Sequence, residues 1–155
     1  MRLKAVVAVV ILGLTATVAV AASVHFKPRS PTFTDNGTTL TARGTLAGLG
    51  NADLTITLQA SGVASTTGFN RGGNAAPGQN VGVTVTASQT ISASSIQNGE
   101  LFFAIETPQP RQPTATEAGF PNDNWTAVIT DVRFTSATIT VVQNGEVVLK
   151  QTFNF

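Results

Sequence analysis

The chain has no cysteine and no tyrosine, and it has a single histidine, His25, among its 155 residues. Without cysteine it cannot form disulfides, build a zinc site of the Cys/His type or carry a lipid on a thiol. A catalytic histidine needs a fixed orienting partner, and His25 has none near it in the sequence. A serine nucleophile would need a Gly-x-Ser-x-Gly elbow, which the sequence lacks. We therefore expect a non-enzymatic protein with no catalytic residue, no metal site and no cofactor.

Charge is also scarce, and its sign depends on the N-terminus. The 9 Lys and Arg residues and 8 Asp and Glu residues give a formal net charge of +1. Arg2 and Lys4 lie at the very start, so a chain that begins at position 22 loses two positive charges and has a net charge of −1. Nucleic acids and anionic membranes attract basic surfaces. We expect neither as a partner of the processed chain.

The N-terminal segment indicates where the protein works. Arg2 and Lys4 precede a mainly apolar stretch from Ala5 to Ala22, and Ala19-Val20-Ala21 supplies the small residues of a cleavage site. A positive start, a short apolar run and an Ala-x-Ala exit predict a signal peptide over 1–21. We expect a secreted protein, extracellular, periplasmic or at the cell surface. The alternative is a retained membrane anchor, although so short a stretch, interrupted by Thr15 and Thr17, would barely span a bilayer.

Beyond residue 32, apolar residues alternate with polar ones, which is the pattern of half-buried strands. The inward-facing rows predicted in this way are Leu40, Ala42, Gly44 and Leu46; Leu54, Ile56, Leu58 and Ala60; Val81, Val83, Val85 and Ala87; Leu101, Phe103 and Ile105; and Trp125, Ala127 and Ile129. Residues 63–69 predict a weaker strand, and 134–142 and 147–155 predict strong ones. Threonine, whose branched Cβ suits strands, is abundant throughout this part of the chain.

These strands predict one all-β domain over residues 32–155. About seven to nine short strands at intervals of roughly 8–12 residues are typical of a Greek-key, immunoglobulin-like β-sandwich. One helical turn is expected within 92–97, and no longer helix. Residues 22–31 hold two prolines and no periodicity, so we expect a flexible N-terminal arm before the domain.

Asn144-Gly145, between two apolar runs, predicts a β-hairpin. A three-residue loop over 143–145 would pair Val141 with Val147 and keep apolar side chains on one face, whereas a two-residue loop would invert them. We therefore predict a type I turn with Gly145 in a G1 bulge. Gln-Asn-Gly-Glu occurs at both 97–100 and 143–146, and we attribute the repetition to recurrent turn chemistry rather than to a duplicated half-domain.

Two segments are longer than a minimal sandwich needs: the loop at 70–80, rich in Gly and Asn, and the loop at 107–124, with four prolines. Long loops on a rigid scaffold often carry binding sites. The candidate ligand-binding residues there are Asn70, Arg71, Asn74, Gln79, Asn80, Asn122, Asp123, Asn124 and Trp125. Trp125 has two interpretations: an exposed ring that stacks on a sugar, or a core residue. The second is preferred, because Trp125 is in phase with Ala127 in the period-two alternation.

The other polar residues fit structural roles better than chemical ones. The eight acidic residues show no spacing that identifies a glycosidase pair, and most lie beside turns. Glu117 and Asn122 to Asn124 lack the alternating pattern of a calcium loop, so turn formation is preferred. Thr-x-Thr pairs at 39/41, 55/57, 84/86 and 138/140 predict either solvent-facing strand positions or a regular hydroxyl surface for ice or glycan. The first interpretation is preferred because sandwich sheets twist.

Four stretches resemble a set of small, uncharacterised secreted bacterial β-proteins: Gly48 to Asn51, Gly72 to Asn80, Asn124 to Thr126 and Thr130 to Val132. The likeness covers most of the chain after residue 21, and the second stretch is its most distinctive part. It implies export and an all-β fold, but no reaction, ligand or catalytic residue. Such proteins often carry cysteine where this chain has Phe69, Phe120 and Phe153, so the resemblance implies aromatic packing in place of cross-links.

Two functions are therefore open. The first is a structural or interaction protein of a bacterial surface or matrix, which associates with itself or with a cell-surface component; weak charge and many strand edges favour association. The second is a small ligand-binding module, with carbohydrate as the expected ligand, that uses the loops at 70–80 and 107–124.

Overall fold

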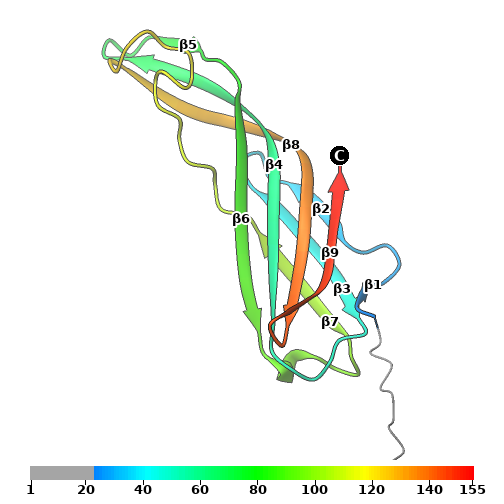
Figure 1. The fold of residues 1–155 in the computed structure, drawn as a ribbon. Helices are drawn as coiled ribbons and strands as arrows, with labels where there is room; N and C mark the ends of the chain where they lie inside the picture. The colour runs from blue at the N-terminus through cyan, green and yellow to red at the C-terminus, as the bar shows by residue number, and fades with distance from the viewer. Residues whose placement is uncertain (1–22) are drawn as a thin grey trace, which may run out of the picture.

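The computed structural model describes residues 23–155 as a two-sheet antiparallel β-sandwich (Figure 1). The predicted signal peptide, 1–21, lies outside the described residues. The strands are β1 (His25–Phe26), β2 (Thr32–Asp35), β3 (Leu40–Ala47), β4 (Leu54–Asn70), β5 (Ala75–Pro77), β6 (Val81–Ile91), β7 (Leu101–Glu106), β8 (Trp125–Gln143) and β9 (Glu146–Asn154). A single 3-10 turn, Ala93–Ser95, fulfils the expected turn within 92–97. The all-β sandwich prediction is confirmed.

The smaller sheet has four strands arranged around β3. Strand β7 pairs with one side of β3, and β1 and β2 share the other side, one after the other. The larger sheet has five strands, in which β6, β4, β8 and β9 lie side by side and β5 pairs with the far end of β4. Strand β8 returns beside β4 after the chain has crossed to the other sheet in β7, which is Greek-key connectivity.

Most of the predicted inward rows contribute to the core between the sheets. Every second residue of β3 from Leu40 to Leu46, of β4 from Leu54 to Ala60 and of β7 from Leu101 to Ile105 is buried. On β6 only Val85 of the predicted row is fully buried, because that strand lies at the edge of its sheet. The alternation in the sequence therefore predicts which face of each central strand is buried. At the edge strand β6 the same alternation predicts burial less well, because part of the inward row stays accessible to solvent.

Strand β4 is one continuous strand of 17 residues, not the two shorter strands that the sequence predicted. Its pairing with β8 contains two β-bulges, between Ser61 and Gly62 and between Ser65 and Thr66. The hydroxyls of the two extra residues on β8, Thr130 and Thr135, donate to carbonyl oxygens of Ser65 and Ser61 at 3.2 and 3.3 Å. Each bulge shifts the alternation of β8 by one residue and so returns apolar side chains to the core.

Residues 25–26 correct the prediction of a flexible arm over 22–31. They form β1, which pairs with Leu46 and Ala47 of β3. The Phe26 ring lies 6.1 Å from that of Phe103 and 5.9 Å from that of Phe153, so this segment closes the edge of the sandwich. This strand could not be predicted from the sequence, because two residues are too few to show an alternation of apolar and polar side chains.

The β8–β9 hairpin corrects the predicted turn. Gln143 pairs with Glu146, so the loop has two residues, Asn144 and Gly145, with φ of 54° and 77°. Two positive φ angles are typical of a type I′ turn. A bulge on β9 beyond the turn then pairs Val141 with Leu149. The bulge, and not a longer loop, thus places these two apolar side chains opposite each other.

The repeated Gln-Asn-Gly-Glu sequence forms the same turn twice. Asn98 and Gly99 also have positive φ angles, 51° and 74°, and Gln97 and Glu100 exchange two backbone hydrogen bonds of 2.9 Å. Both copies therefore form a two-residue turn with the same backbone geometry.

A buried glutamine, Gln143, stabilises the end of the sandwich that contains the β8–β9 turn, which we call the base. The Gln143 amide nitrogen donates to the carbonyl oxygens of Gly50 and Ala52 at 2.9 and 2.8 Å, and its amide oxygen accepts from the Gly50 N–H at 3.0 Å. One side chain thereby joins the β3–β4 turn to the end of β8.

The outer face of the larger sheet carries the expected hydroxyl groups. Pairs of them hydrogen-bond across the strands: Thr57 with Ser88 at 2.8 Å, Ser61 with Thr84 at 3.0 Å and Thr138 with Thr152 at 2.8 Å. The hydroxyls thus satisfy one another along the sheet, as cross-strand pairs of threonine and serine do.

We expect Gln143→Ala to lower the free energy of unfolding by about 2–3 kcal/mol, because it leaves three part-buried backbone groups without partners. Denaturant unfolding followed by circular dichroism measures the change. Gln151→Ala, an exposed glutamine of β9, is the matched control and should stay within about 0.5 kcal/mol of the parent. Equal effects of the two substitutions would contradict this role for Gln143.

Candidate functional site

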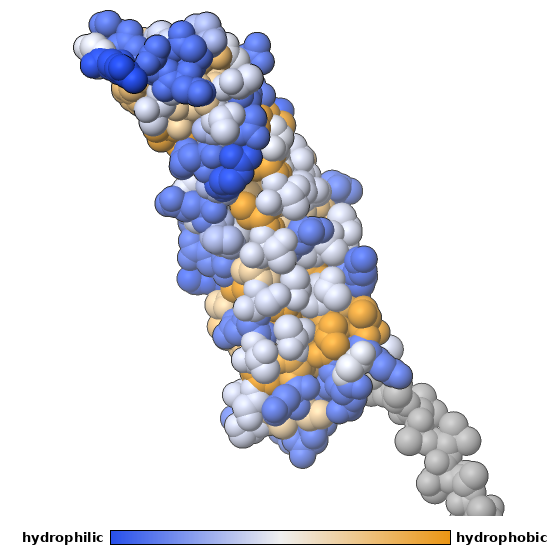
Figure 2. All heavy atoms as spheres, turned by 60° about the vertical axis from the view of Figure 1, so that its left-hand side comes forward, coloured by the Kyte–Doolittle hydropathy of each residue, from blue (hydrophilic) through white to orange (hydrophobic). Residues whose placement is uncertain are grey.

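The loop residues predicted as a ligand site gather at one end of the molecule, which we call the tip: residues 67–80 and 115–127. Strands β4 and β8 extend beyond the smaller sheet to reach it (Figure 1), and Asn70 pairs with Trp125 there. The tip is covered mainly by hydrophilic residues at the upper end of Figure 2. Arg71, Asn74, Gln79, Asn80, Asn122, Asp123 and Asn124 are all exposed, whereas Asn70 and Trp125 are half-buried.

Several polar atoms of the tip are used within its own turns. The Asn70 side-chain oxygen accepts from the N–H groups of Gly72 and Asn74 at 3.0 Å each. The Asn122 side-chain oxygen accepts from the Asn124 N–H at 3.0 Å. These are turn-forming roles of asparagine. None of the nine candidate residues lines any of four hollows on the surface of residues 23–155, which lie near residues 95–102, 81–84, 33–40 and 27–32.

Trp125 belongs to a second, small apolar cluster and not to the main core. Its ring stacks on that of Phe120 with centroids 4.9 Å apart and an angle of 9° between the planes. The cluster also contains Ala115, Ala118 and Ala127. Phe120 in turn lies directly over Gly68 of β4, where any side-chain carbon would overlap its ring. The long 107–124 loop is therefore docked on the larger sheet through Phe120.

Two of the three phenylalanines at positions 69, 120 and 153 pack against other aromatic rings. Phe120 stacks on Trp125, and Phe153 contacts Phe26 and Phe33 with ring centroids 5.9 and 5.1 Å apart. Phe69, by contrast, is 43% exposed at the tip.

An exposed ion pair orders the 107–124 loop. The Arg111 guanidinium donates to Glu117 at 2.8 and 3.2 Å, and the Thr114 N–H donates to the same carboxylate at 2.7 Å. These hydrogen bonds, that of Arg111 first, lower the pKa of Glu117 from 4.5 to about 2. Glu117 thus acts as a turn-stabilising residue.

The other carboxylates with contacts also serve the fold. Asp35 and Asp53 accept backbone N–H groups of Gly37 and Ala93 at 2.9 and 2.8 Å. Glu106 accepts from the Thr39 hydroxyl at 2.6 Å, and Glu100 pairs with Lys27 at 2.7 Å. Among residues 23–155 no three His, Asp or Glu side chains gather in a group that would hold a metal ion.

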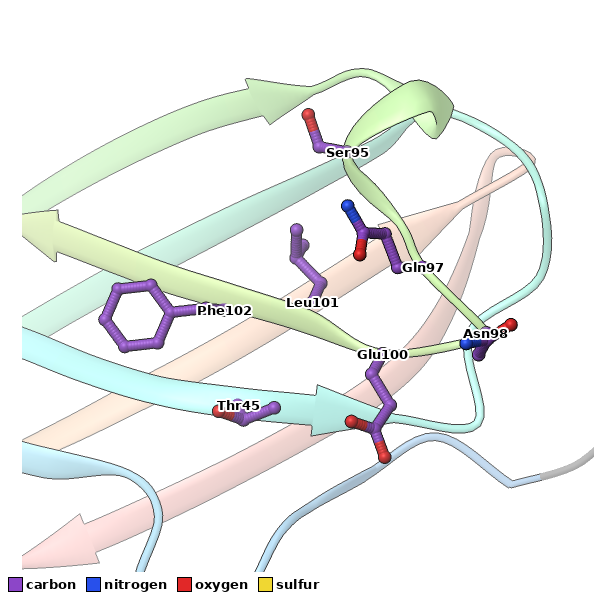
Figure 3. Close-up of a pocket in the computed structure, with 7 residues that line it drawn as sticks. All are labelled: Thr45, Ser95, Gln97, Asn98, Glu100, Leu101 and Phe102. Atoms are coloured by element: carbon purple, nitrogen blue, oxygen red, sulfur yellow. The ribbon is translucent and has the colours of Figure 1, made fainter.

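A different surface offers a binding geometry: the outer face of the smaller sheet. Phe102 of β7 points outward and is 68% exposed. On one side of it lies an open hollow of about 590 Å³, lined by hydroxyl and amide groups of Thr45, Ser95, Gln97 and Asn98 (Figure 3). These side chains come from β3 and from the connection between β6 and β7, and Phe102 comes from β7 itself.

A second hollow of about 360 Å³ also borders Phe102, and it is lined by Lys27, Arg29 and Arg43 among others. Thr45 and Phe102 line both hollows. We call the two together the Phe102 groove. Both hollows are open to solvent, Phe102 and Thr45 are common to them, and Lys27, Arg29 and Arg43 line the second.

A turn over β3 shapes the basic half of the groove. The N–H of Lys27 donates to the Thr45 carbonyl at 2.9 Å, and the Thr45 N–H donates to the Ser30 hydroxyl oxygen at 2.7 Å. Residues 27–30 are thereby fixed at both ends to one residue of β3. Gly44 allows this approach, since a Cβ there would meet Ser30 and the Pro31 backbone.

This groove was not predicted from the sequence. Its one available signal was Phe102 next to Phe103, because neighbours on a strand face opposite ways and only one of the two rings can be buried.

Comparison with known proteins adds little. No protein-family model matches the chain, and no curated protein matches it. One solved structure that it resembles is a "putative beta-galactosidase" from Bacteroides fragilis, at 15% identity over 87% of this chain, with a TM-score of 0.26. The chain spans 16% of the length of that protein. Residues 23–155 contain no helix that is long and apolar enough to cross a membrane.

We expect Gly68→Ala to destabilise the fold by about 1–3 kcal/mol, because the new methyl group overlaps the Phe120 ring. The fluorescence of Trp125, which stacks on Phe120, should change as well. Gly82→Ala on β6 is the control: its Cβ meets nothing within 4 Å, so it should leave the fluorescence unchanged and raise stability by up to about 1 kcal/mol. An unaltered Trp125 signal in Gly68→Ala would contradict the docking of the loop.

The Glu117 carboxyl should titrate with a pKa of about 2 in the folded protein, as followed by NMR of its side-chain carbon. Because the folded-state pKa is depressed, the stabilisation is complete above pH 4.5 and is lost as the pH falls from there to about 2. Arg111→Gln should return the pKa toward 4.5, whereas Arg71→Gln should leave it low. A normal Glu117 pKa in the parent protein would refute the ion pair.

Proposed function

We propose that this chain is an exported, non-enzymatic interaction protein of a bacterial surface or matrix, and that the Phe102 groove is its contact surface. The exposed aromatic ring carries the proposal. Phe102 is 68% exposed and lines both hollows, whereas its neighbour on the strand, Phe103, is buried in the core. Aromatic rings in such positions are typical anchors of recognition sites.

The distribution of carboxylates supports a binding role over a hydrolytic one. Hydrolysis of a glycosidic bond requires two carboxyl groups that face each other across the substrate. Glu100 is the one carboxylate that lines the groove, and it forms an ion pair with the Lys27 ammonium group at 2.7 Å. The groove thus offers hydrogen-bonding groups, cations and a ring, which bind a ligand without a matched acid and base.

We expect Phe102→Ala to weaken binding about tenfold, because it removes one aromatic contact with the ligand and the apolar area that this contact buries. The measurement is cosedimentation of protein expressed from the full chain with cell envelopes and exopolysaccharide of the producing bacterium. Phe69→Ala is the matched control, because it removes the exposed ring of the tip. Loss of binding in Phe69→Ala alone would place the contact surface at the predicted loops, and binding that neither substitution alters would contradict both sites.

A further inference from the structure

The basic half of the Phe102 groove contains two cations that no carboxylate neutralises. Lys27, Arg29 and Arg43 line this half. The ion pairs of residues 23–155 are Lys27–Glu100 and Arg111–Glu117, so within the described chain neither Arg29 nor Arg43 meets a carboxylate. In a chain with so few charges, two unneutralised guanidinium groups beside an exposed ring form a local positive site.

Arg29 occupies a backbone position that suits glycine. Its φ is 64°, and it follows Pro28 in a turn that is closed by the Ser30 N–H donating to the Lys27 carbonyl at 3.1 Å. Proline at the second position and a positive φ at the third are the pattern of a type II turn, whose third residue is usually glycine or asparagine. Strain of this kind clusters at functional sites. The turn that carries Arg29 is therefore a candidate part of a binding surface.

Strand register places Arg43 on the same face as the ring. Arg43 pairs with Thr32 on one side and Ala104 on the other, and Thr45, two residues along β3, pairs with Phe102. Residues two apart on a strand point to the same face and lie about 7 Å from each other. Arg43 thus continues the outward row that contains Thr45, and it lies beside Phe102 across the strand pair.

The opposite half of the groove is neutral. Ser95, Gln97 and Asn98 contribute a hydroxyl and two amides, and the one carboxylate of this half, Glu100, is paired with Lys27. An acidic peptide would meet the same cations, but the hydroxyl and amide groups of this half match a ligand that is rich in hydroxyl groups. A chain of sugar rings has hydroxyl groups for the amides and ring faces for an aromatic side chain. With anionic substituents, it would also match the arginines, which bind carboxylate or sulfate in bidentate fashion.

We propose that the Phe102 groove binds an extended acidic polysaccharide, with Phe102 against a sugar face and Arg29 and Arg43 on its carboxylate or sulfate groups. This inference rests on the proposed function and names the ligand class of the same surface. The anionic group can be a carboxylate or a sulfate, since guanidinium binds both.

The test uses two pairs of probes with matched backbones and protein expressed from the full chain. Oligogalacturonate is compared with its methyl ester, and dextran sulfate with dextran, by isothermal titration calorimetry in low and in physiological salt. We expect at least one acidic probe to bind at least about tenfold more tightly than its neutral counterpart, and we expect added salt to weaken that binding.

Three substitutions assign the binding to the groove. Arg29→Asn keeps a residue that tolerates positive φ, so it should fold normally and bind the acidic probe about tenfold more weakly. Arg43→Gln should have a similar effect. Arg71→Asn at the tip removes the same charge from an exposed position outside the groove, and it should leave the affinity unchanged. Unfolding curves show whether each variant is folded.

The outcomes separate this inference from the proposed function. Equal binding of acidic and neutral probes, or binding of neither while envelope binding still needs Phe102, would overturn the acidic ligand and leave the contact surface standing. A further probe is an oligothymidylate. If it binds more tightly than both acidic probes, and if this binding depends on Arg29 and Arg43, the result would overturn the acidic polysaccharide in favour of nucleic acid. If Phe102→Ala also leaves envelope binding unchanged, both proposals fail.

Discussion

The pairing of β4 with β8 is the constraint on which the rest of the structure depends. Strand β4 pairs with β8 along its whole length, from Leu54 beside Gln143 at the base to Asn70 beside Trp125 at the tip. Each of the two strands then carries an edge partner, β6 on β4 and β9 on β8. The smaller sheet covers only part of this ladder (Figure 1), so the tip needs its own small core of Phe120, Trp125 and three alanines.

Aromatic packing closes the edge between β1 and β2 of one sheet and β9 of the other, in a chain that has no cysteine. Phe153 lies between Phe26 and Phe33, and Phe155 extends the contact to Phe33 at 5.1 Å. The two outer faces of the sandwich then differ in character. One presents threonine and serine hydroxyls that bond to one another, and the other presents an exposed ring with arginines beside it, which is why we place function on the second face.

The period-two alternation was enough to predict the fold class and the buried rows of β3, β4 and β7, because each of these strands has one face on the core. Bulges were not predictable: Thr130 and Thr135 look like ordinary strand residues, and their extra positions follow from the pairing with β4. The same holds for the bulge beyond Asn144-Gly145. The Phe102 groove could not be predicted because it joins residues 27–32, 43–45 and 95–102, which only the strand pairing brings together.

The most direct test of the account is to map where a ligand binds on a folded, isotopically labelled protein. Backbone amide spectra recorded during a titration with oligogalacturonate should show shifts concentrated at Arg29, Arg43, Thr45 and Phe102, with the indole N–H of Trp125 unmoved. Shifts concentrated at Asn70, Asn122 and Trp125 would contradict the account and assign binding to the tip.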